Sequence, residues 1–234
     1  MTEALEEYDC EEFEMEGTLL KKYKGKGGAV KIPNGVSAVG YAAFRDSEAL
    51  TEVEIPQSVS AINRSAFAGC SGLKRVYLPD GVRTIRASAF RGCLSLERVR
   101  IPDGVTLLGE EAFCNCPSLT EITVPAGICE IAPLAFYRCP KLTEIEIPRG
   151  VVTVMQSAFA GCDGLKRITV SESVKEIGNM VFFDCGALTD IDYHGSKGAW
   201  ETIKKDKNWI DRKQDFTVHC TDGDLSNLRK PKLR

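Results

Sequence analysis

The chain has 234 residues, a hydrophobic content of 43% and a formal net charge of -3 at pH 7. This length and composition suffice to bury a sizeable core, and the missing basic excess argues against a nucleic-acid-binding protein. No apolar run approaches the roughly 18 residues that a membrane-spanning helix needs, so we expect no insertion into a membrane.

The N-terminal segment, up to Gly17, is acidic and contains no Lys or Arg. A secretory signal begins with basic residues followed by an apolar stretch, which this segment lacks. We therefore expect a cytoplasmic location, with the cell surface as the alternative if an export signal has been removed. Phe13, Met15 and Leu19 alternate around the turn at Gly17, so residues 1–31 are predicted to form an N-terminal β-hairpin cap.

A 23-residue unit repeats seven times, without insertion or deletion, over residues 32–192. Units of this size are too small to bury a core alone, so they stack on one another in a solenoid. The unit reads IPxGVxxIGxxAFxGCxxLxxVx, with its apolar positions in three short groups. Its LxxVx segment alternates inward and outward as a strand does, and these strands are expected to pair in parallel.

One phenylalanine per unit lies in register, mostly preceded by alanine, which leaves room for a tight turn on the back of each coil. We expect the rings to form an aromatic spine through the solenoid. The spine residues are Phe44, Phe67, Phe90, Phe113, Phe136, Phe159 and Phe182.

Six of the ten cysteines also recur at the repeat period: Cys70, Cys93, Cys116, Cys139, Cys162 and Cys185. Equivalent side chains of stacked coils point in parallel, which favours buried thiols over disulfides. Ser47 takes this position in the first unit, which indicates a small side chain that hydrogen-bonds a turn. Cys114 and Cys116 give a CxC spacing with no histidine nearby, a weak zinc signal, so we expect no metal site and no cofactor.

After the last repeat the pattern changes. Ser196 is placed to cap a helix that carries Trp200, and a short alternating strand follows. We interpret residues 193–223 as a C-terminal cap and residues 224–234 as a disordered tail.

The combination LxxVxIPxGVxxIGxxAFxGC resembles the BspA-like class of bacterial leucine-rich repeats over residues 32–192. The resemblance implies a right-handed, curved solenoid with a parallel β-sheet on one face and short helical or irregular turns on the other. It implies binding rather than catalysis, and several relatives are surface proteins that attach to host matrix proteins or other cells. The asparagine ladder of ordinary leucine-rich repeats is absent, because Gly or Ser takes that position.

The outward residues of the predicted strands form an ordered series of charges across the sheet face. Opposite charges on neighbouring strands, such as Glu52 and Arg75, lie about 4.8 Å apart and can satisfy each other. Arg167 is expected to bridge Glu144 and Asp190 in this way. Because solenoids bind over broad faces, a single pocket is not expected.

Two adjacent strands combine three guanidinium groups and a phenol, the groups that most often anchor interfaces. These residues are Arg75, Tyr77, Arg98 and Arg100. An acidic edge would orient the ligand, and it consists of Glu144, Glu146, Asp190 and Asp192. We expect a protein partner, with an anionic glycan as the alternative.

Three other functions remain open: a self-associating scaffold, a cell-surface adhesin and a polysaccharide-active enzyme. Enzymes of the last kind also place carboxylates and an arginine on a sheet face, as Glu144, Arg167 and Asp190 do here. No position breaks the repeat to install such chemistry, and no phosphate loop, nucleophile elbow or CxxC pair occurs. His194 and His219 fall in the C-terminal cap, where histidines usually pack or hydrogen-bond. We therefore interpret the chain as a non-enzymatic binding module.

Overall fold

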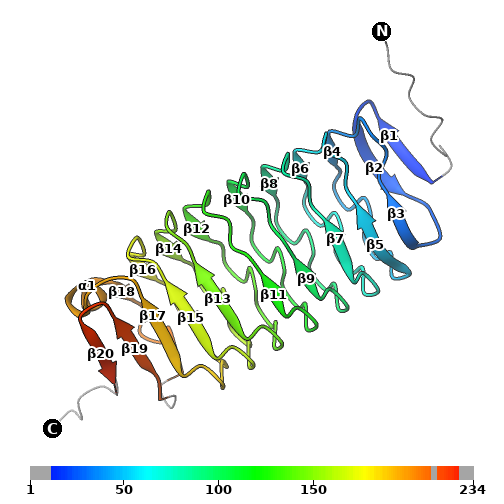
Figure 1. Ribbon diagram of the computed structural model, residues 1–234. Helices are drawn as coiled ribbons and strands as arrows, with labels where there is room; N and C mark the ends of the chain where they lie inside the picture. The colour runs from blue at the N-terminus through cyan, green and yellow to red at the C-terminus, as the bar shows by residue number, and fades with distance from the viewer. Residues whose placement is uncertain (1–11, 212–214, 227–234) are drawn as a thin grey trace.

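The computed structural model describes residues 12–211 and 215–226. Figure 1 shows an elongated stack of coils, with the strands β1 and β20 at its opposite ends. Short strands of successive coils pair in parallel along most of the stack. Within the described residues the only α-helix is α1 (Lys197–Thr202). The predicted parallel solenoid is confirmed.

The predicted strands form a first ladder, in which residues 23 positions apart are paired, as Glu52 is with Arg75. The alternation of apolar residues places one buried side chain, such as Val53, between two outward ones. The strands are β3 (Gly28–Lys31), β5 (Leu50–Glu54), β7 (Arg75–Tyr77), β9 (Arg98–Val99), β11 (Glu121–Ile122), β13 (Glu144–Ile147), β15 (Arg167–Val170) and β17 (Asp190–Tyr193).

A second ladder, which was not predicted from the sequence, runs along another side of the coils. Its strands have only two residues each, too few for an alternating pattern to reveal them. They are β4 (Ala38–Val39), β6 (Ala61–Ile62), β8 (Thr84–Ile85), β10 (Leu107–Leu108), β12 (Glu130–Ile131), β14 (Thr153–Val154) and β16 (Glu176–Ile177).

The N-terminal end of the stack carries an antiparallel hairpin of β1 (Phe13–Glu16) and β2 (Leu19–Tyr23). Gly17 takes the left-handed conformation in its turn, with φ of 58°. The hairpin covers the first coil because β2 pairs in parallel with β4.

At the C-terminal end, Ser196 caps α1 by accepting a hydrogen bond from the Ala199 N–H, as the sequence predicts. The second ladder ends in β18 (Lys204–Lys205), and the first ends in β19 (Thr217–Cys220). A last strand, β20 (Gly223–Ser226), folds back on β19. The cap boundary expected at residue 223 was therefore wrong, and residues 227–234 lie outside the described part of the chain.

The seven repeat phenylalanines are buried and stack in one column through the coils. Neighbouring ring centroids are 4.8 to 6.0 Å apart, with interplanar angles of 2° to 19°. Tyr23 continues the stack into the N-terminal cap, and Trp209 closes it edge-on at the other end. The column thus joins every coil to both caps.

The six repeat cysteines are buried, and none forms a disulfide. Each thiol donates a hydrogen bond to the carbonyl of the phenylalanine in the preceding coil, with sulfur to oxygen distances of 3.0 to 3.3 Å. Burial raises the pKa of these thiols, to about 12 for Cys70. At neutral pH they are protonated donors that satisfy buried carbonyls, and not nucleophiles.

The turn side of each coil is irregular rather than helical. It holds two residues in the left-handed conformation, one on each side of the phenylalanine. The second of these is glycine in three coils and Asp46, Asn115, Arg138 or Asp184 in the others. A residue with a side chain pays about 1–2 kcal/mol for this conformation, less for Asn and Asp. Around the phenylalanine, every second backbone N–H group donates a hydrogen bond to a carbonyl of the next coil, as the Phe44 N–H does to the Ala66 oxygen.

Both ladders are interrupted between the fourth coil (residues 101–123) and the fifth (residues 124–146), a boundary that we call the seam. Neither β10 with β12 nor β11 with β13 is paired, so the two ladders form four separate sheets. The rings of Phe113 and Phe136, on either side, are 6.0 Å apart, the widest step between two of the repeat phenylalanines. On the turn side the Phe113 N–H still donates to Ala135, at 2.8 Å. The coils therefore splay on their sheet sides and stay joined at their turns.

Phe90→Ala is expected to destabilise the protein by about 3 to 5 kcal/mol, because the ring stacks on both neighbours and its loss leaves a cavity. Urea denaturation followed by circular dichroism measures this loss. Phe90→Leu, which keeps most of the apolar volume, is the control and should lose less. A loss for Phe90→Ala within about 0.5 kcal/mol of zero, as for a surface substitution, would contradict the proposed role of the column.

Backbone amides that face the seam are expected to exchange hydrogen at least about tenfold faster than equivalent amides in the next coil. Across the boundary between the fifth and sixth coils, the Met155 N–H donates to the Ile131 carbonyl and the Lys166 N–H donates to the Thr143 carbonyl. At the seam, the equivalent N–H groups of Ala132 and Thr143 make no such bond within the described residues. Hydrogen exchange with mass spectrometry compares the two boundaries. Equal protection at both would show that the ladders continue across the seam in solution.

Candidate binding surfaces

The first ladder places the predicted cluster on two adjacent strands. Arg75 of β7 is paired in register with Arg98 of β9. Tyr77 lies at the end of β7, and Arg100 takes the equivalent position one coil later. All four side chains are between 50% and 77% exposed, so the structure presents them together on one face.

Within the described residues, the guanidinium groups of this cluster hold only long, exposed ion pairs. Their carboxylate partners lie at 3.5 to 3.8 Å: Arg75 with Glu52, Arg98 with Glu121, and Arg100 with Asp80. Exposed pairs contribute about 0 to 1 kcal/mol each. A partner's carboxylates can therefore replace them at little cost.

The acidic edge lies on β13 and β17, with Arg167 of β15 between them. Arg167 donates to both carboxylate oxygens of Asp192, at 2.6 and 2.8 Å, and lies 3.6 Å from Asp190. The hydrogen bond to Asp192 raises the pKa of the guanidinium. The expected bridge to Glu144 was wrong, and neither Glu144 nor Glu146 has an ion-pair partner within the described residues.

His219 of β19 lies between two carboxylates, an arrangement that the sequence analysis missed. Its Nε2 is 2.8 Å from Asp190, and its Nδ1 is 3.1 Å from Asp224 of β20. The hydrogen bonds to Asp190 and then to Asp224 raise the pKa of His219, and the bond from His219 lowers the pKa of Asp190. When protonated, His219 donates to both carboxylates and thus links β20 to β17 across β19.

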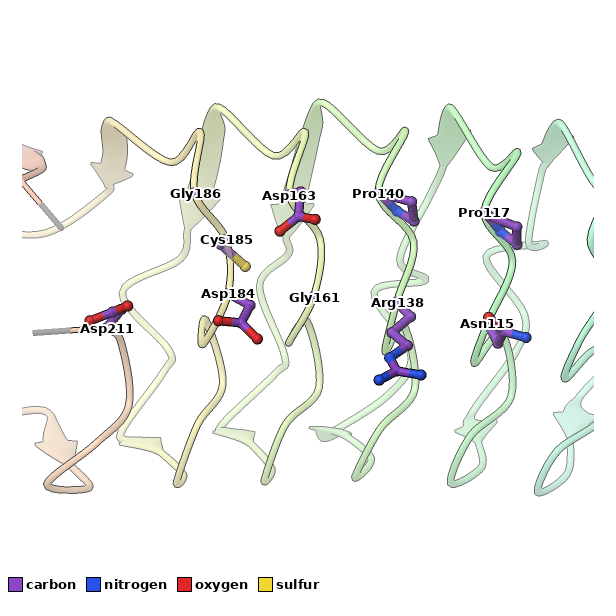
Figure 2. A pocket seen from close by; sticks show the side chains of 10 residues that line it. All are labelled: Asn115, Pro117, Arg138, Pro140, Gly161, Asp163, Asp184, Cys185, Gly186 and Asp211. Atoms are coloured by element: carbon purple, nitrogen blue, oxygen red, sulfur yellow. The ribbon is translucent and has the colours of Figure 1, made fainter. Parts of the chain in front are cut away.

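A furrow of about 700 Å³ runs along the turn side from the fourth coil to the C-terminal cap (Figure 2). Two rows of residues line most of it, those before the repeat cysteines and those after them: Asn115, Arg138, Gly161 and Asp184, and Pro117, Pro140, Asp163 and Gly186. Asp211 lies at its C-terminal end. The furrow lies on the turn side, so the expectation that the sheet face binds over a broad area without a pocket stays a prediction.

The described residues contain no group of three or more His, Cys, Asp or Glu side chains that is arranged to hold a metal ion. Cys114 and Cys116, the CxC pair, are both buried free thiols. In the same part of the chain, no helix has the length and apolar character to cross a membrane.

Residues 24–143 and 83–204 match the BspA-type leucine-rich repeat region, in six copies. The chain belongs to the BspA-type leucine-rich repeat family. A leucine-rich repeat protein of T. pallidum is 34% identical, with a TM-score of 0.66 over 73% of this chain and 82% of that one. A leucine-rich cell surface protein of Faecalibacterium prausnitzii A2-165 is 29% identical, with a TM-score of 0.56 over 77% and 63% of the two chains.

The pneumococcal vaccine antigen PcpA is 20% identical, with a TM-score of 0.57 over 85% of this chain and 44% of that one, and shares the fold. No curated protein matches the chain. Membership of the BspA-type family confirms the resemblance seen in the repeats. Leucine-rich repeat proteins commonly serve as interaction modules.

His219→Gln is expected to lower thermal stability more at pH 5.5 than at pH 8.5. Because the folded pKa of His219 is raised, its contribution is fully present below the unfolded pKa of about 6.5 and is lost as pH rises through the folded value. Because the folded pKa of Asp190 is lowered, its contribution to stability is fully present above the unfolded pKa of about 3.9. This contribution is lost as pH falls through the folded pKa. Melting curves at both pH values measure the difference.

The exposed His194 provides the matched control, because the structure gives its ring no carboxylate partner within the described residues. His194→Gln should change the melting temperature little at either pH. A loss in His219→Gln that is the same at pH 5.5 and 8.5 would mean that the imidazolium charge does not hold the hairpin.

Proposed function

We propose that this BspA-type repeat protein is a non-enzymatic binding module, which recognises a protein partner through the exposed face of its first ladder. The observation that supports this proposal is the cluster of Arg75, Tyr77, Arg98 and Arg100. It gathers three guanidinium groups and a phenol on adjacent strands, where none is needed to bury the core.

The backbone beneath the cluster is rigid. β7 and β9 are paired, and Val76 and Val99 between the outward residues are buried in the core. Fixed strands reduce the entropy lost when the side chains meet a partner. The planar guanidinium groups suit carboxylates, which favours an acidic protein segment as the ligand. Glu144 and Glu146, further along the face, would attract a basic part of the same partner.

The F. prausnitzii relative is described as a cell surface protein, which motivates adhesion to another cell or to a matrix as one form of this function. An anionic glycan would offer the same carboxylates to the cluster, and a second copy of the chain is the structural alternative. Mass measured against concentration separates self-association from the other two.

The variant Arg75→Glu, Arg98→Glu, Arg100→Glu is expected to bind a captured partner at least about tenfold more weakly, because arginine is enriched among the hot-spot residues whose loss costs about 2 kcal/mol or more. Affinity capture compares it with the wild type in a lysate of the source cell and in a host-matrix extract. The control is Arg64→Glu, Arg86→Glu, which reverses exposed charges elsewhere on the coils. If the wild type, the triple variant and the control variant all capture the partner equally, the cluster is not part of the binding surface.

A further inference from the structure

Arg138 occupies a backbone position that suits it poorly. Its φ is 57°, in the left-handed region, at the place where the second, third and sixth coils carry glycine. Asp46, Asn115 and Asp184 fill the position in the remaining coils, and short Asn and Asp side chains tolerate this conformation through local hydrogen bonds. Arginine has no such compensation. Left-handed residues with side chains also occur at the first left-handed position of each coil, but at this second position only Arg138 departs from Gly, Asn and Asp, which motivates the hypothesis of a role beyond folding.

The surroundings of Arg138 hold its side chain in place. Gly161 in the next coil leaves room for it, since a Cβ atom there would lie 3.1 Å from the Arg138 Cγ. The guanidinium carbon lies 5.1 Å from the ring centroid of Tyr137, a cation–π contact. No carboxylate within the described residues lies at ion-pairing distance from Arg138. The positive charge is therefore oriented but not neutralised.

The furrow around Arg138 is dipolar. Figure 2 shows Arg138 in the same coil as Pro140, next to the coil that carries Pro117, with the carboxylates of Asp163 and Asp184 in the coils that follow. Successive coils lie about 4.8 Å apart, so the cation and the carboxylates are separated by roughly 5 to 10 Å along the stack. A ligand with charges of both signs at this spacing fits in one direction only.

We propose that the furrow is a second binding site, which takes an extended peptide segment with an acidic residue at Arg138 and a basic residue at Asp163 and Asp184. Extended chain rises about 3.3 Å per residue, so the two charges would be roughly two or three residues apart. A sugar is disfavoured because the residues that line the furrow include no aromatic ring to stack on, and the guanidinium of Arg138 already covers a face of the neighbouring Tyr137. The site lies on the turn side, separate from the first-ladder cluster.

Arg138→Gly is the informative variant, because it separates binding from folding. Glycine is native to this position in other coils, so the variant is expected to keep or raise the melting temperature. Arg138→Asp also keeps a residue that the position accepts, and it reverses the charge. If Arg138 serves the fold alone, neither variant should alter peptide binding.

The probe is a library of random 12-residue peptides displayed on phage and panned against the wild-type protein. Peptides with an acidic residue near a basic one are expected to be enriched. Synthesised with a fluorescent label, the enriched peptide should bind Arg138→Gly at least about tenfold more weakly by anisotropy, and Arg138→Asp more weakly still. Replacing its acidic residue by the amide should weaken wild-type binding without weakening binding to Arg138→Gly further.

The Arg75→Glu, Arg98→Glu, Arg100→Glu variant distinguishes this site from the first-ladder cluster and should bind the peptide as the wild type does. The proposal is overturned if no peptide is enriched, or if the enriched peptides bind Arg138→Gly as tightly as the wild type. It is also overturned if only the triple variant loses them, which would assign the peptides to the first-ladder face.

Discussion

The structure depends on contact between equivalent residues of successive coils. A single coil buries almost nothing alone, so each phenylalanine, each thiol to carbonyl bond and each strand is stabilised by its counterparts in neighbouring coils. Phe90, for example, stacks on Phe67 and Phe113, at 5.2 Å each. A side chain that points inward must therefore suit both neighbours. Outward side chains carry no such demand, which leaves them available for binding.

This constraint explains what the sequence reveals. Each inward position recurs in all seven repeats, so the 23-residue period of the sequence reveals the spine, the buried cysteines and the first ladder. The second ladder is hidden because its strands have two residues each. Side-chain direction is hidden as well: register places Arg167 beside both Glu144 and Asp190, but only the folded geometry shows that it turns to Asp192. The furrow escaped prediction because it arises partly from missing side chains, at Gly161 and Gly186.

In a repeat protein, the informative residues are those that break the repeat. The fifth coil departs most from the common pattern of its turn side. Leu134 and Arg138 both take the left-handed conformation there, although neither residue type favours it. Pro133, the only proline at its position, restricts the backbone of Ala132, which lies next to the seam. Local choices that conflict with the global fold are expected at functional sites rather than in scaffolding.

The arginine and tyrosine cluster and Arg138 lie on opposite sides of the seam along the stack. The arginine and tyrosine cluster belongs to the second and third coils, whereas Glu144, Glu146 and Arg138 belong to the fifth. Across the seam the blocks are joined by turn-side hydrogen bonds, by the bond from the Cys139 thiol to the Phe113 carbonyl and by the widened contact of Phe113 with Phe136, not by either ladder. If the tilt between the blocks varies at the seam, a partner that touches one block makes the same contacts at any tilt, so it cannot favour one tilt. A partner that reaches from Arg98 to Glu144 contacts both blocks, and its affinity then includes the free energy of fixing their relative orientation.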